Sequence, residues 1–87
     1  MTNTVNQPIE ITSLEFARHR QERLEAFPKR MIWDDREYTF VEIGMHFLVK
    51  KGQDLVRLFD VSDGQNDYRL KCDDQNHWTL VSTRAIA

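Results

Sequence analysis

From residue 29 onward, apolar and polar side chains alternate in short runs that are separated by turn residues. The clearest run has apolar side chains at every second position: Tyr68, Leu70 and Cys72. A second run begins at Trp78, and the polar residues 73–76 connect the two. A period of two is typical of β-strands, because successive side chains of a strand point to opposite faces of a sheet. The sequence therefore predicts an antiparallel hairpin in this region.

Turn residues divide the rest of this half into further strands. Asp63-Gly64 is a strong turn signal, because glycine adopts the positive φ that tight turns require. Residues 51–53 predict a second turn, and residues 34–36 predict a hairpin turn between strands 30–33 and 37–41. The simplest arrangement of such strands is a sequential antiparallel meander of four or five strands, whose twist curls it into a half-barrel.

The apolar phase changes in the middle of this region. Tyr38 and Phe40 are out of phase with the later apolar set that begins at Ile43. One extra residue in a strand moves the following side chains to the other face, and an isolated glycine such as Gly44 often marks the insertion. We therefore expect a β-bulge or bend between residues 41 and 44.

The N-terminal third has a different character. Residues 1–11 carry few apolar side chains and predict a flexible leader. Thr12 and Glu15 have the spacing of a capping box, in which each side chain accepts a backbone N–H of the other residue. Pro28 sets a boundary, because the residue before a proline avoids helical geometry. These signals predict a helix over residues 12–26.

Together these elements predict an α+β fold in which one N-terminal helix packs on a curled four- to five-stranded antiparallel β-meander. A chain of 87 residues leaves room for one small domain, which we place at residues 12–83, followed by a C-terminal tail at 84–87. The predicted core consists of Leu14, Leu24, Ile32, Phe40, Ile43, Phe47, Leu58, Leu70, Trp78 and Leu80.

Charge and hydropathy exclude several classes of protein. Twelve basic and fourteen acidic residues give a net charge of −2, and neither half of the chain is strongly basic, as sequence-independent nucleic-acid binding would require. No apolar stretch approaches the roughly 20 residues of a membrane span, and no secretory signal layout is present. The single cysteine, Cys72, cannot form an internal disulfide. We expect a cytoplasmic protein that does not bind membranes.

The sequence contains no pattern that predicts an enzyme or a cofactor. Gly44, Gly52 and Gly64 are too widely scattered to form a phosphate-binding loop. A nucleophilic Cys72 would need nearby positive charge, whereas Asp73 and Asp74 follow it directly and oppose the thiolate. We therefore expect neither catalytic residues nor a bound cofactor.

Two groups of residues raise the question of metal binding. Cys72 and His77 bracket a short loop, but a structural zinc site needs four ligands, and neither His19 nor His46 has suitable spacing to this pair. The acidic residues around Asp63 are out of register with a calcium-binding loop. We interpret these acidic residues as solvated carboxylates in a turn, and we predict no metal site.

The spacing of Pro28, Trp33 and Tyr38 resembles that of a group of small uncharacterised bacterial β-meander domains. The resemblance continues at Tyr68-Arg69-Leu70 and Trp78-Thr79-Leu80 and covers residues 28–82. Asp34-Asp35 stand where these domains usually have a glycine and basic residues, and Phe47 stands where they often have tryptophan. The resemblance implies a small β fold, and it assigns no activity to any residue.

The first functional hypothesis is a non-enzymatic protein-interaction module, acting either by self-association or on a partner. The strands carry more apolar side chains than a small core needs, among them Leu48, Val56 and Val81. A domain of this size buries a limited share of its surface, so oligomerisation or partner binding would support its stability.

The alternative is a nucleic-acid-binding accessory domain. Its contacts would come from Arg18, Lys29, Arg30 and Trp33, where basic side chains stand near an aromatic ring that could stack on a base. Loss of binding at high salt would distinguish this function from protein binding.

Overall fold

The computed structural model describes residues 1–18 and 24–86, with the exception of the side chains of Ala17, Arg18 and Leu24. The described residues form eight strands in two antiparallel sheets and contain no helix. The prediction of an α+β fold is therefore wrong. The strands are β1 (Thr2–Pro8), β2 (Glu10–Arg18), β3 (Leu24–Trp33), β4 (Arg36–Thr39), β5 (Glu42–Lys51), β6 (Asp54–Ser62), β7 (Asn66–Cys72) and β8 (Trp78–Ala85).

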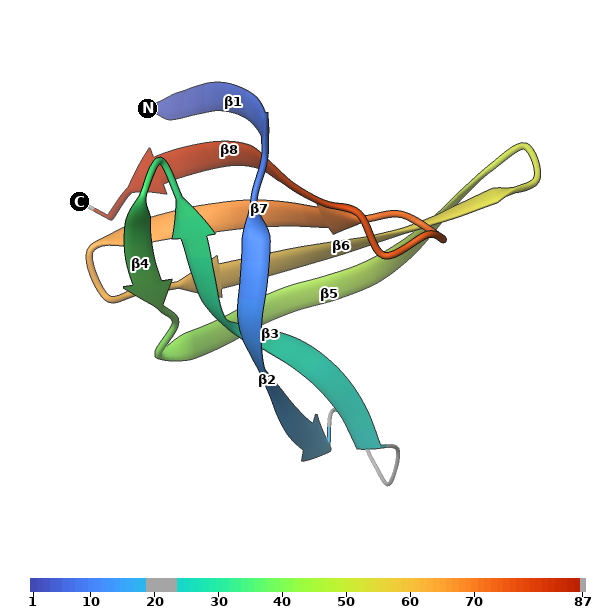
Figure 1. The fold of residues 1–87 in the computed structure, drawn as a ribbon, viewed down its shortest axis with the longest axis horizontal. Coiled ribbons are helices and arrows are strands. Elements are labelled where there is room, and N and C mark those ends of the chain that lie inside the picture. The colour runs from blue at the N-terminus through green and yellow to red at the C-terminus, as the bar shows by residue number, and fades with distance from the viewer. Residues whose placement is uncertain (19–23, 87) are drawn as a thin grey trace.

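The two sheets cross each other at a steep angle (Figure 1). The larger one has the strand order β1-β8-β7-β6-β5, and the smaller one has the order β2-β3-β4. The chain passes between them at Ile9 and again at Phe40 and Val41. At the second corner, the Phe40 N–H donates to the Lys29 carbonyl of the smaller sheet, while the Val41 N–H donates to the Ser62 carbonyl of the larger one. Strands that switch sheets in this way are typical of orthogonal β packing.

Strands β2 and β3 stand where the sequence predicts a helix over residues 12–26. Residues 19–23 of that segment lie outside the described residues, and the parts on either side form a hairpin. A helix cap contributes about 1 kcal/mol. The hairpin instead brings Phe27 and Met31 over the larger sheet, where both side chains are fully buried. Burial of two such side chains contributes about 4 kcal/mol, which outweighs the local capping signal.

Pro28 lies within β3 and does not end a secondary-structure element. Its neighbour Lys29 is the extra residue of a bulge, because the register passes from Ser13 opposite Arg30 to Leu14 opposite Pro28. Proline lacks a backbone N–H and is tolerated in sheets beside such irregularities.

Both ends of the chain take part in the larger sheet. Thr2–Pro8, within the segment expected to be a flexible leader, forms β1 and pairs with β8. The strand β8 continues to Ala85, within the segment expected to be a tail, and the Ile86 N–H donates to the Gln65 carbonyl. The pairing of β1 with β8 satisfies backbone groups of β8 that would otherwise form an open sheet edge.

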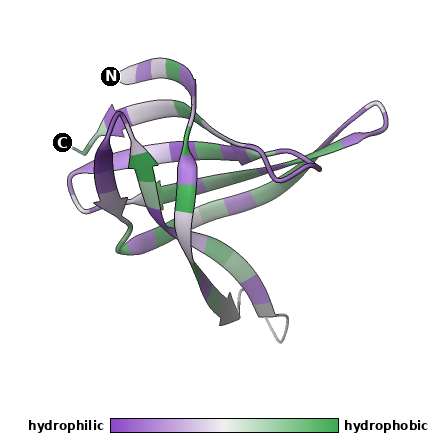
Figure 2. Ribbon diagram, in the orientation of Figure 1, coloured by the Kyte–Doolittle hydropathy of each residue, from purple (hydrophilic) through white to green (hydrophobic). Residues whose placement is uncertain are grey.

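The predicted turns and the predicted bulge are confirmed. Gly64 and Gly52 have φ values of 95° and 64° in the two turns where the sequence predicts them. The register of β5 on β6 shifts between Ile43 and His46, which places a bulge next to the predicted segment 41–44. The hydropathy colouring in Figure 2 shows the alternation of apolar and polar residues along these strands.

The core lies between the two sheets. Its buried side chains are Phe27, Met31, Phe40, Phe59, Val61, Tyr68, Leu70, Cys72 and Leu80. Of the predicted core, Phe40, Leu70 and Leu80 are buried. Leu14 is half exposed, because it lies on an edge strand and not on a helix. The side chain of Leu24 lies outside those that the structure describes. Within the described residues, no helix has the length and hydropathy to cross a membrane.

Candidate functional site

A row of side chains, of which three are buried and His46 is half-buried, defines the inner face of the larger sheet. His46, Phe59, Leu70 and Leu80 are register partners on β5, β6, β7 and β8, so their side chains share one face. Phe27 of β3 covers this row, with its ring centroid 5.5 Å from that of His46 and 6.1 Å from that of Phe59. The imidazole of His46 also lies 3.0 Å from the Glu25 carboxylate on β3.

The next row on the same face is only partly covered. Leu48, Arg57, Cys72 and Trp78 are register partners across the same four strands. Cys72 is buried and Trp78 is half-buried, whereas Arg57 is exposed and Leu48 is 58% exposed. The inner face is thus closed at β7 and open at β5 and β6.

We call Leu48, Leu55 and Arg57 the open end of the inner face. Leu55 pairs with Lys50 one step further along the β5–β6 hairpin and is 44% exposed. Figure 1 shows this hairpin extending beyond the strands of the smaller sheet. The open end therefore presents two leucines and an arginine on the face that elsewhere forms the core.

The charge of Arg57 is not neutralised by a neighbour in the described part of the chain. None of the ion pairs among those residues includes it. Its guanidinium is near enough to Cys72 to favour the thiolate slightly, although burial and the charge of Asp73 act more strongly and raise the pKa of the thiol. Arg57 is thus a cation available to a partner, while Cys72 remains a protonated core residue.

In the loop that follows Cys72, the polar groups contact one another. The Cys72 Sγ lies 3.5 Å from the Asp73 carbonyl and 3.7 Å from the Asn76 side-chain oxygen. The His77 side chain is exposed, and its Nδ1 lies 3.4 Å from the Asp73 carboxylate. In residues 1–18 and 24–86, no three His, Cys, Asp or Glu side chains are grouped so that they could hold a metal ion.

The residues predicted to bind protein do not form one patch. Leu48 belongs to the open end, whereas Val56 pairs with Val49, the next residue along β5, and so faces the opposite side of the sheet. Val81 lies at a register irregularity of β8, two strands away from β6. Leu55 was not singled out from the sequence. Its signal was the presence of apolar residues in both phases of the β6 run.

The basic residues of the nucleic-acid hypothesis lie on two strands, β2 and β3. Lys29 lies 3.5 Å from the Glu15 carboxylate. Arg30 follows it directly on β3 and is exposed. Arg18 ends β2, and its side chain lies outside the described ones. Of the two basic side chains of this set that the structure describes, Lys29 is therefore paired with a carboxylate.

Trp33 is held in place by its neighbours. Its indole N–H donates a 2.8 Å hydrogen bond to the Gln7 side chain, and its ring lies 5.8 Å from that of Tyr38. The exposed residues Asp34 and Asp35 follow it in the turn. An indole in a fixed hydrogen bond beside two carboxylates is poorly placed to stack on a base of a polyanion.

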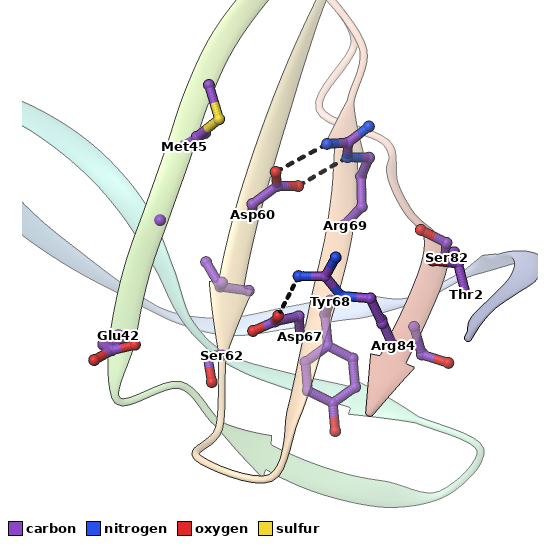
Figure 3. A pocket seen from close by; sticks show the side chains of 13 residues that line it. Thr2, Glu42, Met45, Asp60, Ser62, Asp67, Tyr68, Arg69, Ser82 and Arg84 are labelled. Atoms are coloured by element: carbon purple, nitrogen blue, oxygen red, sulfur yellow. Dashed lines mark hydrogen bonds and ion pairs between the residues drawn. The ribbon is translucent and has the colours of Figure 1, made fainter. Parts of the chain in front are cut away.

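A hollow of about 430 Å³ lies on the opposite, outer face of the larger sheet (Figure 3). Arg69 makes two hydrogen bonds to Asp60, at 2.8 and 2.9 Å, and Arg84 makes one to Asp67 at 2.9 Å. Both arginines are therefore paired with carboxylates. These pairs fit a role in holding the strands together better than a role in binding an anion.

A second hollow, of about 550 Å³, lies where the two sheets separate. One wall includes Ile9 and the β2 residues Ile11 and Leu14, and the other includes His77 and Trp78, the first residue of β8. The Ile9 N–H donates a hydrogen bond to the Trp78 carbonyl, which links the two walls. We call this hollow the β2 groove.

No protein-family model matches the chain, and neither the curated proteins nor the solved structures include a significant match. The resemblance to small bacterial β-meander domains stays a prediction. The function is therefore argued from the open end, the β2 groove and the charges around them.

Proposed function

We propose that this domain is a non-enzymatic protein-interaction module whose contact surface is the open end of the inner face. The observation that carries the proposal is the exposure of Leu48 and Leu55 on the face that forms the core elsewhere. Covering each of these half-exposed leucines would contribute about 1 kcal/mol. Apolar groups gathered on one exposed face are typical of interaction surfaces.

The charge of this surface favours a partner over a second copy of the domain. Arg57 and Lys50 share the face of Leu48 and Leu55, as their register positions require. A symmetric dimer through the open end would bring these cations of both copies together, which is unfavourable. A partner with apolar and acidic groups is complementary to the same surface.

The nucleic-acid alternative has less support. Its basic residues come from two strands, β2 and β3, and carboxylates accompany both Lys29 and Trp33. Binding to phosphates depends on several cations that act on one surface.

The test compares capture of proteins by the tagged domain and by two variants, from a lysate of the source cells split into nuclease-treated and untreated halves. We expect Leu48→Asp and Leu55→Asp each to reduce capture of the same protein about tenfold, because a carboxylate in an apolar contact loses its hydration. Ile86→Asp is the matched control, since Ile86 is 48% exposed and lies at the end of the chain. It should leave capture unchanged.

Circular dichroism of each variant separates loss of binding from loss of folding. Equal capture by the folded wild type, Leu48→Asp and Leu55→Asp would contradict the proposal. Capture that disappears only in the nuclease-treated half would favour the nucleic-acid alternative. Light scattering of the purified domain measures self-association, and we expect a monomer.

We also propose a cytoplasmic location. Cys72 is a free, buried thiol on β7. A single reduced cysteine suits a reducing compartment. Alkylation of the denatured protein directly after cell lysis should label Cys72 completely, and a disulfide-linked form at that step would contradict this location.

A further inference from the structure

The β2 groove combines an open sheet edge with an apolar wall. In the strand order of the smaller sheet β2 is at the edge and, among the described residues, pairs only with β3. An edge strand carries backbone N–H and C=O groups that point away from its one neighbour and can pair with another chain. The side chains of Ile9, Ile11 and Leu14 line the adjoining hollow.

One row of register partners on the larger sheet joins the groove to the open end. Trp78 lines the groove and also begins the row that continues through Cys72 and Arg57 to Leu48. Neighbouring strands lie about 4.8 Å apart, so Arg57 lies about 10 Å from Trp78 along this row. The strands of the smaller sheet cross those of the larger one (Figure 1). A chain that runs beside β2 therefore follows the direction of such a row.

Opposite charges lie at the groove and further along this row. Glu10 lies at the groove wall, whereas Arg57 is an exposed cation further along the row, without an ion pair among the described residues. An acidic side chain of an occupant would be repelled near Glu10 and attracted near Arg57. The apolar side chains of Ile11, Leu14 and Trp78 also line the groove.

From this arrangement, and resting on the proposed function, we propose that the groove binds an extended segment of a partner protein as an added strand on β2. Alternate apolar side chains of the segment contact Ile11, Leu14 and Trp78, and an acidic side chain beyond them pairs with Arg57. Strand addition obtains affinity from backbone hydrogen bonds and specificity from every second side chain.

The test selects binders from a displayed library of random nonapeptides on the full-length domain. We expect enriched peptides with apolar residues at alternate positions and an acidic residue near one end. With one such peptide in synthetic form, the amides of residues 10–14 should exchange with deuterium more slowly, because they gain hydrogen bonds or cover. A scrambled peptide of the same composition is the control for the peptide.

Two variants test the charge. Arg57→Glu should raise the Kd of the peptide about tenfold or more, as expected for loss of a hydrogen-bonded charge pair. Arg36→Glu is the matched control, since Arg36 is an exposed arginine in β4 of the smaller sheet. It should change the Kd less than twofold.

Three outcomes would overturn strand addition on β2. They are the absence of enrichment above empty resin, peptide binding with unchanged exchange at residues 10–14, and equal effects of Arg57→Glu and Arg36→Glu. Slow exchange at residues 10–14 in a peptide-free dimer would make a second copy the occupant and also overturn the proposal. The proposed function fails separately, when Leu48→Asp and Leu55→Asp leave capture of the natural partner unchanged.

Discussion

The phenol of Tyr68 donates a 2.7 Å hydrogen bond to the Asp63 carboxylate, across the turn that joins β6 to β7. The same carboxylate accepts the backbone N–H groups of Gln65 and Asn66 at 2.9 and 2.8 Å. One aspartate thus holds both the turn and a core residue, since Tyr68 is only 2% exposed. This link fixes the hairpin in the middle of the larger sheet.

Removing this phenol tests the link. Tyr68→Phe should lower the free energy of unfolding by about 1–2 kcal/mol, because the Asp63 carboxylate loses a charged hydrogen bond while the ring remains in the core. Tyr38→Phe is the matched control, because no hydrogen bond of the Tyr38 hydroxyl is found among the described residues. Urea unfolding of both variants measures the difference. Equal losses would show that the Tyr68–Asp63 bond contributes nothing specific.

Asp63 should make the stability sensitive to acid. Burial raises the pKa of its carboxyl group, but the hydrogen bonds from Tyr68, Asn66 and Gln65 outweigh burial and hold the pKa below the ordinary 3.8. A lowered pKa in the folded state contributes stability above pH 3.8 that is lost as the pH falls through the folded value. We expect Asp63→Asn to be less stable at pH 7 and to lose less stability than wild type between pH 4 and pH 2. Urea midpoints over this range measure it, and parallel curves would contradict the assignment.

Tyr68 should have the opposite effect in alkali. Burial, followed by the hydrogen bond to Asp63, raises the pKa of the phenol well above the ordinary 10.0. A raised pKa contributes stability that is fully present below pH 10 and is lost as the pH rises toward the folded value. Tyr68→Phe should therefore lose less stability than wild type between pH 9 and pH 11. Thermal midpoints in this range provide the measurement, and an unchanged slope would argue against it.

The two arginine–aspartate pairs of the outer face should contribute unequally to the free energy of unfolding. Arg69 binds Asp60 through two nitrogens and lies 5.5 Å from the centre of the Phe47 ring, whereas Arg84 makes a single bond to Asp67 and is more exposed. Arg69→Lys should lower the free energy of unfolding by less than about 1 kcal/mol, because lysine cannot reproduce the paired geometry. The loss should be smaller at high salt, because salt screens the ion pair. Arg84→Lys is the control and should show no measurable change. A larger loss in Arg84→Lys would reverse this order.

The turn between β3 and β4 offers a stabilising change. Asp34 and Asp35 both have positive φ, at 54° and 61°, in a two-residue hairpin turn. Glycine reaches this conformation without steric cost and is favoured at the second position, so Asp35→Gly should raise the stability by about 0.5–1 kcal/mol. Asp74→Gly is the control, since Asp74 does not have positive φ. It should lower the thermal midpoint, and a similar fall in Asp35→Gly would contradict the prediction.

The strands from residue 29 onward and their turns could be predicted from the sequence because their signals are local. Gly64, which follows Asp63, and Gly52 can adopt positive φ without steric cost wherever they stand in the fold, and both have it in the structure. The change of apolar phase before His46 likewise reports a bulge without knowledge of the partner strand. Periodicity and turn chemistry depend on residues that are neighbours in the sequence, so these signals hold whatever the tertiary contacts are.

The N-terminal third could not be assigned in this way. Thr12 and Glu15 satisfy the local pattern of a helix cap, yet both lie in β2. The deciding contacts are those of Phe27 with His46 and Phe59, which are 19 and 32 residues away in the sequence. No local pattern contains them. The smaller sheet therefore exists because of packing between distant segments, which outweighs local propensity.

The sequence by itself determined a small chain with more apolar strand residues than its core uses, and Leu48 was found that way. Only the tertiary structure decided which of these residues are covered. Leu48 and Phe59 share the inner face, but the smaller sheet, which has three strands among the described residues, covers Phe59 and leaves Leu48 exposed. Exposure is set by the width of one sheet over another. It is therefore a property of the assembled layers and not of any local stretch of sequence.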